Sequence, residues 1–454
     1  MPQNQAIYDA RQLGRAKMFI LGVQHMFAMF GATVLVPALT GLSVSATLLF
    51  AGLGTLLFHF ITKRKVPAFL GSSFAFIGGY QAIAPMLEDG SANDQMLPYA
   101  CFGVMLAGLM YVILSALFKV FGTKKVMRYF PPIVTGPVII CIGLTLSSTA
   151  ITNCRDNWAI ALIAIAIVVG YNIWGKGMVK IIPILLGVVG SYGVAVICQV
   201  TGMHTMDPAK LQALADAPWI GLPFQFEDTL FGLFSRPDLD TGLLLTAAVT
   251  IMPLSLATMV EHIGDMCAIS STCERNYLQD PGFHRTLLGD GLATSLASIF
   301  GAPANTTYGE NTGVLALSKV YDPRVIRIAA GLAILFSFSP KFAALVSAMP
   351  TATMGGVSMV LYGMISAVGV RNVVENQVDF TNSRNVIIAA LIMVLAIGIN
   401  YSGAVSFQVG EATISLSGLA VAAITGIVLN AILPGKDYEF GHDEKGDTAV
   451  NFKV

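Results

Sequence analysis

Two acidic residues four positions apart, Glu261 and Asp265, follow the uncharged run 241–260, and no further charge occurs before residue 274. If this segment is a helix, the two carboxylates share one face. Inside an apolar bundle, burial and mutual repulsion favour protonation of one of the two near physiological pH, as proton coupling requires. The alternative is that the helix ends at Val260 and that both acids belong to a cytoplasmic collar.

A third acid, Glu310, lies in the segment 302–313, whose sequence Ala-Pro-Ala-Asn-Thr-Thr-Tyr-Gly-Glu-Asn-Thr-Gly interrupts a long stretch without Lys or Arg. Irregular backbone at membrane depth is tolerated where it is buried in protein or lines a cavity, and an acid there indicates a functional site. If a half-helix begins after Gly309, its N-terminus presents free N–H groups to a ligand. Glu310 can then accept N–H groups of that ligand. The alternative is that Glu310 only caps the helix.

Further polar and aromatic side chains in apolar stretches have two interpretations each. Asp290 serves either proton coupling or the orientation of backbone from a neighbouring helix. Gln24 and His25 are either hydrogen-bonded structure or a ligand or proton-coupling contact. The residues of the broken segment that either support a ligand site or satisfy local backbone are Asn305, Thr306, Thr307 and Asn311. The aromatic residues that either stack on a planar ligand or only pack are Phe74, Tyr308 and Tyr362.

The composition indicates that membrane-spanning elements position these residues. The chain is 55% hydrophobic and 11% charged, whereas soluble domains carry roughly 25% charged residues. We therefore predict an all-α polytopic protein in a lipid bilayer. The formal net charge is zero, so we expect no nucleic-acid partner. The six cysteines lack metal-ligand spacing, and the chain contains no Walker A loop, haem site or nucleophile triad that we recognise. We expect no metal, no cofactor and no ATP-driven mechanism.

Fourteen apolar runs are candidates to span the bilayer. They lie at approximately 18–38, 44–62, 67–88, 97–118, 131–150, 157–174, 181–201, 241–270, 286–301, 304–318, 325–348, 350–369, 385–400 and 413–433. With the N-terminus inside, 22 of the 26 Lys and Arg residues fall on the inside, as the positive-inside rule requires. We therefore expect a cytoplasmic N-terminus (1–17), an outer loop with short interfacial helices (202–240) and a cytoplasmic tail (434–454).

A weak internal repeat relates two of these runs. The segments 67–74 and 303–310 both begin with Pro-Ala, continue with an extended stretch of small residues and lead into a further apolar run. They belong to the third and the tenth run, which is the third of each set of seven. Because seven is odd, the two sets would have opposite orientations. Interrupted segments at matching places in inverted halves indicate a binding site near the middle of the membrane.

Five stretches together carry a family resemblance. They are 24–37, 70–76, 261–264, 305–313 and the Met-Gly-Gly-Val-Ser of 354–358 leading to Tyr362. With them the chain resembles the nucleobase–ascorbate transporter family (nucleobase:cation symporters), and within it the bacterial uracil permeases, from about residue 22 to residue 430. The combination is highly specific, although any one stretch alone is weak.

This resemblance implies fourteen helices in two inverted repeats of seven, with two short antiparallel strands at mid-membrane. The core domain would comprise 18–125 and 241–348, and the gate domain 126–201 and 349–433. The resemblance also implies a proton-driven symporter in the cell membrane, acting as a homodimer. Glu261 and Glu310 would grip the base, and backbone amides at Phe74 and Gly309 would contact it. The other residues that the resemblance places in or beside the pocket are Ser73, Tyr308 and Tyr362.

Two positions depart from the uracil-permease pattern. Asp265 stands where that pattern has a second histidine, and Asp290 stands where it has Asn; both acids resemble the purine-transporting branch. Glu310, however, stands where that branch has Gln, and Glu suits the ring N–H groups of uracil. We therefore expect uracil as the substrate, with xanthine or another oxopurine as the alternative. Two pocket acids argue against the sulfate and bicarbonate carriers of the same fold. A passive channel and a membrane enzyme are the remaining alternatives.

Overall fold

The computed structural model describes residues 6–87, 91–176, 178–203, 205–309, 311–409 and 412–436. Within these ranges, eight helices are long and apolar enough to cross a membrane, or nine if one sharply bent pair forms a single span. The chain is thus a mostly helical, polytopic membrane protein, as predicted.

The elements of the first part of the chain are η1 (Ala10–Leu13), α1 (Arg15–Thr40), α2 (Val44–Ile61), β1 (Leu70–Ser72), η2 (Phe74–Phe76), α3 (Ile77–Ile83), α4 (Leu97–Phe121), α5 (Thr123–Met127), α6 (Pro132–Cys154), α7 (Trp158–Trp174), α8 (Met178–Ile181) and α9 (Pro183–Val200). The segment 202–240, which the sequence predicted to be an outer loop, follows, and as expected it contains two short helices, α10 (Pro208–Asp216) and α11 (Leu230–Phe234).

The elements of the second part are α12 (Thr241–Ile251), α13 (Leu254–Thr272), η3 (Leu278–Gly282), α14 (Phe283–Ile299), β2 (Asn305–Thr307), α15 (Asn311–Ser318), α16 (Pro323–Ser337), α17 (Pro340–Ser347), α18 (Thr351–Glu375), α19 (Ser383–Ser402), β3 (Val405–Val409), β4 (Ala412–Leu416) and α20 (Gly418–Ile432).

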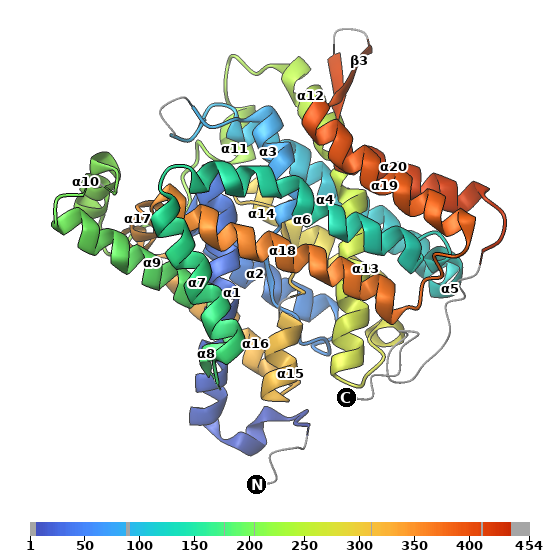
Figure 1. Cartoon of the computed structure of the whole chain (residues 1–454), viewed down its shortest axis with the longest axis horizontal. Coiled ribbons are helices and arrows are strands. Elements are labelled where there is room, and N and C mark those ends of the chain that lie inside the picture. The colour runs from blue at the N-terminus through green and yellow to red at the C-terminus, as the bar shows by residue number, and fades with distance from the viewer. Residues whose placement is uncertain are drawn as a thin grey trace.

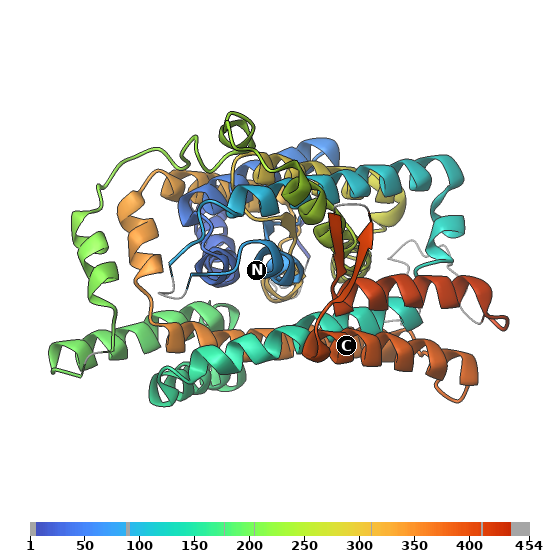
Figure 2. The same ribbon diagram turned by 90° about the horizontal axis from the view of Figure 1, so that it is seen from above.

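The helices form two layers, which Figure 2 shows edge-on. One layer contains α6, α7, α9, α18, α19 and α20, in which α18 packs extensively against α6 (Figure 1). The other contains α1 to α4 and α12 to α16, in which α14 packs on α4 and α2, and α16 packs on α2. The layers touch through α1 with α9 and through α13 with α6 and α20. Helix α13, which carries Glu261 and Asp265, therefore lies where the layers meet.

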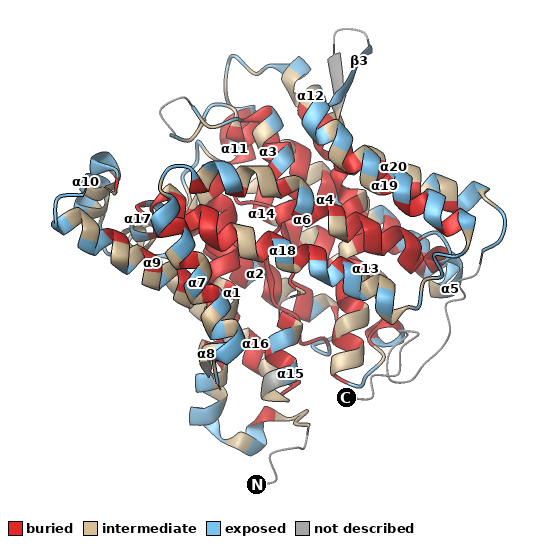
Figure 3. Cartoon of the chain, in the orientation of Figure 1, coloured by how far each residue is buried: buried red, intermediate tan, exposed pale blue. Residues whose placement is uncertain are grey.

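Burial concentrates in the middle of the molecule, where α2, α14 and both short strands lie, whereas the outer helices α9, α19 and α20 alternate buried and exposed residues (Figure 3). Within this centre, α4 and α14 approach each other closely at Gly108 and Gly291. A Cβ on Gly108 would lie 2.7 Å from the carbonyl oxygen of Gly291. Small residues permit such backbone approach in membrane helices. The close crossing places Asp290 in the centre of the fold.

Three of the predicted spans differ from the observed elements. The run 241–270 divides into α12 and α13 at Met252 and Pro253, because proline cannot donate the backbone hydrogen bond that a continuous helix needs. The run 325–348 bends by 89° between α16 and α17, where Ser339 caps the new helix by accepting from the Phe342 N–H. The run 413–433 begins with strand β4, not with helix.

Strand β4 pairs with β3 in an antiparallel hairpin that the sequence analysis missed. The residues 405–409, Val-Ser-Phe-Gln-Val, alternate apolar and polar types, and the residues 412–416, Ala-Thr-Ile-Ser-Leu, do the same. This period of two is typical of strands. Helix α20 begins only after Ser417, whose hydroxyl accepts from the Ala420 N–H.

Candidate functional site

The two broken segments meet in a two-stranded antiparallel sheet. Leu70 pairs with Thr307, and Ser72 pairs with Asn305. The pairing extends at both ends, because Ser73 N donates to Ala304 O at 2.9 Å and Tyr308 N donates to the carbonyl of the residue before β1 at 3.1 Å. The predicted pairing of the third and tenth spans is thus confirmed.

Side chains from the surrounding helices complete the hydrogen bonding of these buried strands. Thr55 Oγ1 of α2 accepts from Leu70 N at 2.9 Å, and Thr294 Oγ1 of α14 donates to Asn305 O at 2.9 Å. The Tyr80 hydroxyl of α3 accepts from the backbone N–H before β2 at 3.1 Å. Such partners are required where water and lipid offer none. They hold the strands rigidly in the centre of the protein.

The aromatic residue that follows β2 packs across β1. A Cβ on Gly71 would lie 2.5 Å from the ring of Tyr308, so only glycine leaves room for that ring. The Tyr308 hydroxyl donates to Ser72 O at 3.0 Å, and the side chain is buried. Tyr308 therefore stabilises the strand pair, which is the packing interpretation. This contact does not test a further role in ligand binding.

The carboxylate pair lies on one continuous helix. Helix α13 runs through Val260 to Thr272, so the alternative in which the helix ends at Val260 is wrong. Asp265 is 6% exposed, and Glu261, one turn earlier, is partly buried. A Cβ on Gly309 would lie 2.5 Å from Asp265 Oδ1. Asp265 thus abuts the turn between β2 and α15, at the break in the tenth span.

Glu310 lies outside the described residues, whereas its neighbour Asn311 is the first residue of α15. Asn311 is fully buried. Its Nδ2 donates to Pro67 O at 2.7 Å, and its Oδ1 lies 3.1 Å from His25 Nδ1 of α1. Gln24, the neighbour of His25, is buried as well. Asn311 therefore joins the start of α15 to α1 and to the segment before β1.

Asp290 of α14 orients the backbone of β2. Its Oδ1 accepts from Thr307 N at 2.8 Å, so Asp290 orients backbone, that of a strand instead of a neighbouring helix. This contact does not test a role in proton coupling. Its Oδ2 lies 3.2 Å from Nδ1 of His262 on α13. His262 was not among the residues predicted for the site, because it faces away from Glu261 and Asp265. Its place directly after Glu261 in the sequence could have indicated that it lies near the site.

One aromatic contact joins the two layers at the site. Phe74, the first residue of η2, meets Tyr362 of α18 edge-on, with ring centroids 5.8 Å apart. Both rings are buried. Ser73, which precedes Phe74, is buried with them. Phe74 thus lies both at the end of β1 and against the opposite layer.

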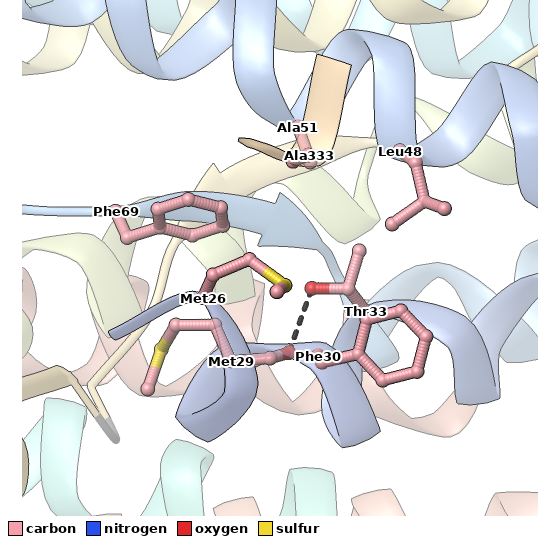
Figure 4. A pocket seen from close by; sticks show the side chains of 8 residues that line it. All are labelled: Met26, Met29, Phe30, Thr33, Leu48, Ala51, Phe69 and Ala333. Carbon is pink, nitrogen blue, oxygen red and sulfur yellow. Dashed lines mark hydrogen bonds between the residues drawn. The ribbon is translucent and has the colours of Figure 1, made fainter. Parts of the chain in front are cut away.

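A small apolar cavity lies between α1, α2, α16 and the residue before β1 (Figure 4). Its lining residues are Met26, Met29, Phe30, Thr33, Leu48, Ala51, Phe69 and Ala333. The Thr33 hydroxyl donates to Met29 O at 2.8 Å, so the only polar side chain there is satisfied by its own helix. The free space is about 10 Å³, which is about the minimum for one water. This cavity is therefore too small for a base. Within the described ranges, no three His, Cys, Asp or Glu side chains gather closely enough to hold a metal ion.

Sequence comparison places the chain among known transporters. A profile described as Permease family matches residues 16–404. The chain is 38% identical to the uracil permease of Bacillus subtilis (strain 168) over 445 residues, covering 95% of each protein. It is 40% identical to the uracil permease of Bacillus caldolyticus over 443 residues, covering 95% of this chain and 96% of that one.

Structural comparison agrees on the architecture. The transmembrane domain of the cyanobacterial bicarbonate transporter BicA superposes with a TM-score of 0.55 at 14% sequence identity, covering 94% of this chain and 99% of that one. At this identity the likeness concerns the fold alone. The resemblance derived from the five sequence stretches is confirmed: the chain is a transporter, not an enzyme, and it belongs to the permease family of the nucleobase–ascorbate transporters.

Proposed function

We propose that the chain is a proton-coupled symporter that imports uracil across the cell membrane. The observation that carries this proposal is the contact between Asp265 on α13 and Gly309, at the junction of the two broken segments. It brings an acidic helix face against the first turn of a half-helix. An acceptor-rich face and a donor-rich helix end together suit a ligand that has both N–H groups and carbonyls, as uracil does.

The proposed roles match the acceptor-rich helix face and the donor-rich helix end to the polar groups of the base. Glu261 and Glu310 accept the ring N–H groups of the base. The backbone amides at Phe74 and Gly309 donate to its carbonyl oxygens. Tyr308, Tyr362 and Ser73 line the pocket.

The proton is carried by the pair Glu261 and Asp265. Two carboxylates one turn apart on a buried helix favour a state in which one is protonated. Uracil is neutral, so co-transport of one proton moves one net charge inward. The residues that support the pocket around this pair are Asp290, Asn311, His25 and Gln24.

The two helix layers support a division into a core domain (18–125 and 241–348) and a gate domain (126–201 and 349–433). We further propose fourteen spans in two inverted repeats of seven, with the strands at mid-membrane. Both termini are cytoplasmic in this arrangement, and the protein acts as a homodimer. Neutralisation of the carboxylate pair eases movement of the core past the gate, since α13 lies where the layers meet.

The test is uptake of labelled uracil into proteoliposomes that are acidic outside, with labelled xanthine in parallel. We expect uphill accumulation of uracil, its loss with an uncoupler, and its loss in Glu261→Gln and Glu310→Ala. Asp379→Asn is the matched control, because Asp379 is an acid whose carboxylate bonds Thr381 in the loop 376–382.

Each rival function predicts a different result. Equal uphill transport of xanthine would contradict the pyrimidine assignment. Xanthine is the pertinent comparison because Asp265 and Asp290 resemble the purine-transporting branch. Equilibration without accumulation would indicate a channel. A chemically altered product inside the vesicles would indicate an enzyme.

A further inference from the structure

His262 joins α13 directly to both β2 and α14. Its Nδ1 lies 2.9 Å from Thr307 Oγ1 and 3.2 Å from Asp290 Oδ2. Thr307 N in turn donates to Asp290 Oδ1. The three side chains are at most 4% exposed. A closed triangle of polar groups therefore ties three elements together away from water.

The chemistry of the triangle determines the form of the imidazole. An ionised carboxylate only accepts hydrogen bonds. Asp290 Oδ2 has no hydrogen-bond partner among the described residues, so its 3.2 Å approach to Nδ1 is a close polar contact, and a hydrogen on Nδ1 avoids two opposed lone pairs there. His262 Nε2 has no hydrogen-bond partner among the described residues, and the ring meets that of Tyr111 on α4 edge-on, with centroids 6.4 Å apart. A ring that donates through Nδ1 fits this setting, because Thr307 Oγ1 and Asp290 Oδ2 are the oxygens that lie near that nitrogen.

The position of the triangle links it to the proposed base site. His262 directly follows Glu261, and Thr307 comes two residues before Gly309. The hydrogen bond between His262 and Thr307 therefore fixes the distance between the helix that carries the acids and the strand that leads into α15. His262 lies outside the group of residues that would touch the base.

We propose that His262 is a positioning residue for base binding: as an Nδ1–H donor it holds the end of β2 against α13 and so keeps the two halves of the base site in register. The proposal rests on the proposed function, in which Glu261 and the Gly309 turn bind one base. It assigns His262 an effect on affinity, not on the movement of the layers.

The decisive comparison is between two amides. In His262→Asn the side-chain nitrogen can occupy the place of Nδ1, whereas in His262→Gln the amide reaches the place of Nε2. We expect His262→Asn to keep the KM for uracil within about three-fold of wild type, and His262→Gln and His262→Ala to raise it by about ten-fold, the effect of one lost buried hydrogen bond. The maximal rate should change far less than KM in all three.

A second series tests whether Thr307 belongs to the same unit. Thr307→Val removes Oγ1 and keeps the shape. Its matched control is Thr286→Val, because Thr286 is an equally buried threonine whose hydroxyl bonds only within α14. We expect the KM effects of His262→Ala and Thr307→Val to be strongly non-additive, as for partners in one network, and Thr286→Val to leave KM unchanged. Size-exclusion profiles in detergent identify any variant that fails to fold.

The outcomes separate this proposal from the assignment of the base. A wild-type KM in His262→Ala would overturn the positioning role, as would an His262→Asn variant as impaired as His262→Ala. If the wild type transports xanthine instead of uracil, the same series measured with xanthine decides the role of His262. A wild type that binds neither base would overturn both proposals.

Discussion

Asp265 of α13 and Gly309 after β2 are packed so closely that a Cβ on Gly309 would lie 2.5 Å from Asp265 Oδ1. We predict that Gly309→Ala displaces the carboxylate or the turn and lowers uracil uptake by about ten-fold or more, since a shift of about 1 Å at a binding site can cost about a hundred-fold. Gly313→Ala is the control, because a Cβ there meets no atom within 4 Å. Initial rates of uracil uptake test this prediction. Equal rates in the two variants would show that the contact between Asp265 and Gly309 does not matter for uptake.

Asp290 should matter for stability through its backbone contact. Asp290→Ala leaves the buried N–H of Thr307 without its acceptor, which costs about 1–3 kcal/mol. In Asp290→Asn the amide oxygen can still accept from Thr307, and the amide nitrogen can donate to a His262 that carries its hydrogen on Nε2. We therefore predict a thermal midpoint several degrees below wild type for the alanine variant and a small change for the asparagine variant. Melting of the purified protein in detergent measures both, and equal losses would mean that charge matters more than the hydrogen bond.

The ring contact between Phe74 and Tyr362 should couple the two layers. Edge-on aromatic pairs contribute about 0.5–1.5 kcal/mol beyond simple burial. We predict that Phe74→Leu and Tyr362→Leu each weaken base binding and that their double mutant is less impaired than the sum, with a coupling energy of that size. Tyr362→Phe keeps the ring and should bind nearly as wild type. Strict additivity in equilibrium binding would show that the two rings act independently.

The N-terminal segment is docked by Asp9, and this contact should respond to pH in one direction. The Asp9 carboxylate accepts from Arg11 and from Arg324 of α16, and the hydrogen bond with Arg11 is the main reason that the pKa of Asp9 lies well below its usual range. Because this pKa is lowered, the contribution of Asp9 to the stability of the docked segment is constant above about pH 4, the ordinary pKa of Asp. The contribution is lost as the pH falls below that value.

We therefore predict that trypsin cleavage at Arg11 and Arg15 in detergent, expressed relative to cleavage of an unfolded peptide at the same pH, is equally slow at pH 6 and pH 8. Asp9→Asn should speed cleavage at both pH values, because the amide cannot hold the two arginines as a carboxylate does. Asp379→Asn, at another surface acid, should not change it. Faster cleavage at pH 6 in the wild type would contradict this assignment.

Much of the site followed from residue types. A broken apolar run with Pro, Gly and an acid predicted an extended, non-helical segment at 302–313, because irregular backbone inside a membrane protein must find partners. The spacing of Glu261 and Asp265 predicted a shared face, which the continuity of α13 bears out. These two conclusions needed only local sequence, whereas the pairing of β2 with β1 was implied by the family resemblance.

Other features depend on which elements become neighbours. His262 faces away from the acid pair, so only the packing of α13 on β2 and α14 reveals its contacts. The bend between α16 and α17 and the break before α13 occur within long apolar runs, where Pro340 and Pro253 mark the places but do not give the size of each bend. The alternation of apolar and polar residues indicated the β3–β4 hairpin. However, β4 overlaps the start of the apolar run 413–433, which is long enough to be a membrane span.

The sheet at the centre joins residues that are made far apart in time. Tyr308, whose hydroxyl bonds Ser72 O, is 236 residues later in the chain, which a ribosome working at about 5–20 residues per second reaches roughly 10–50 s later. During this interval β1 has no strand partner. Thr55 Oγ1 already accepts from Leu70 N, and His59 Nε2 donates to Ala68 O at 2.9 Å, and both side chains belong to α2, which is synthesised first. The first half of the nascent chain can thus satisfy backbone groups in and before β1 until the second half is synthesised.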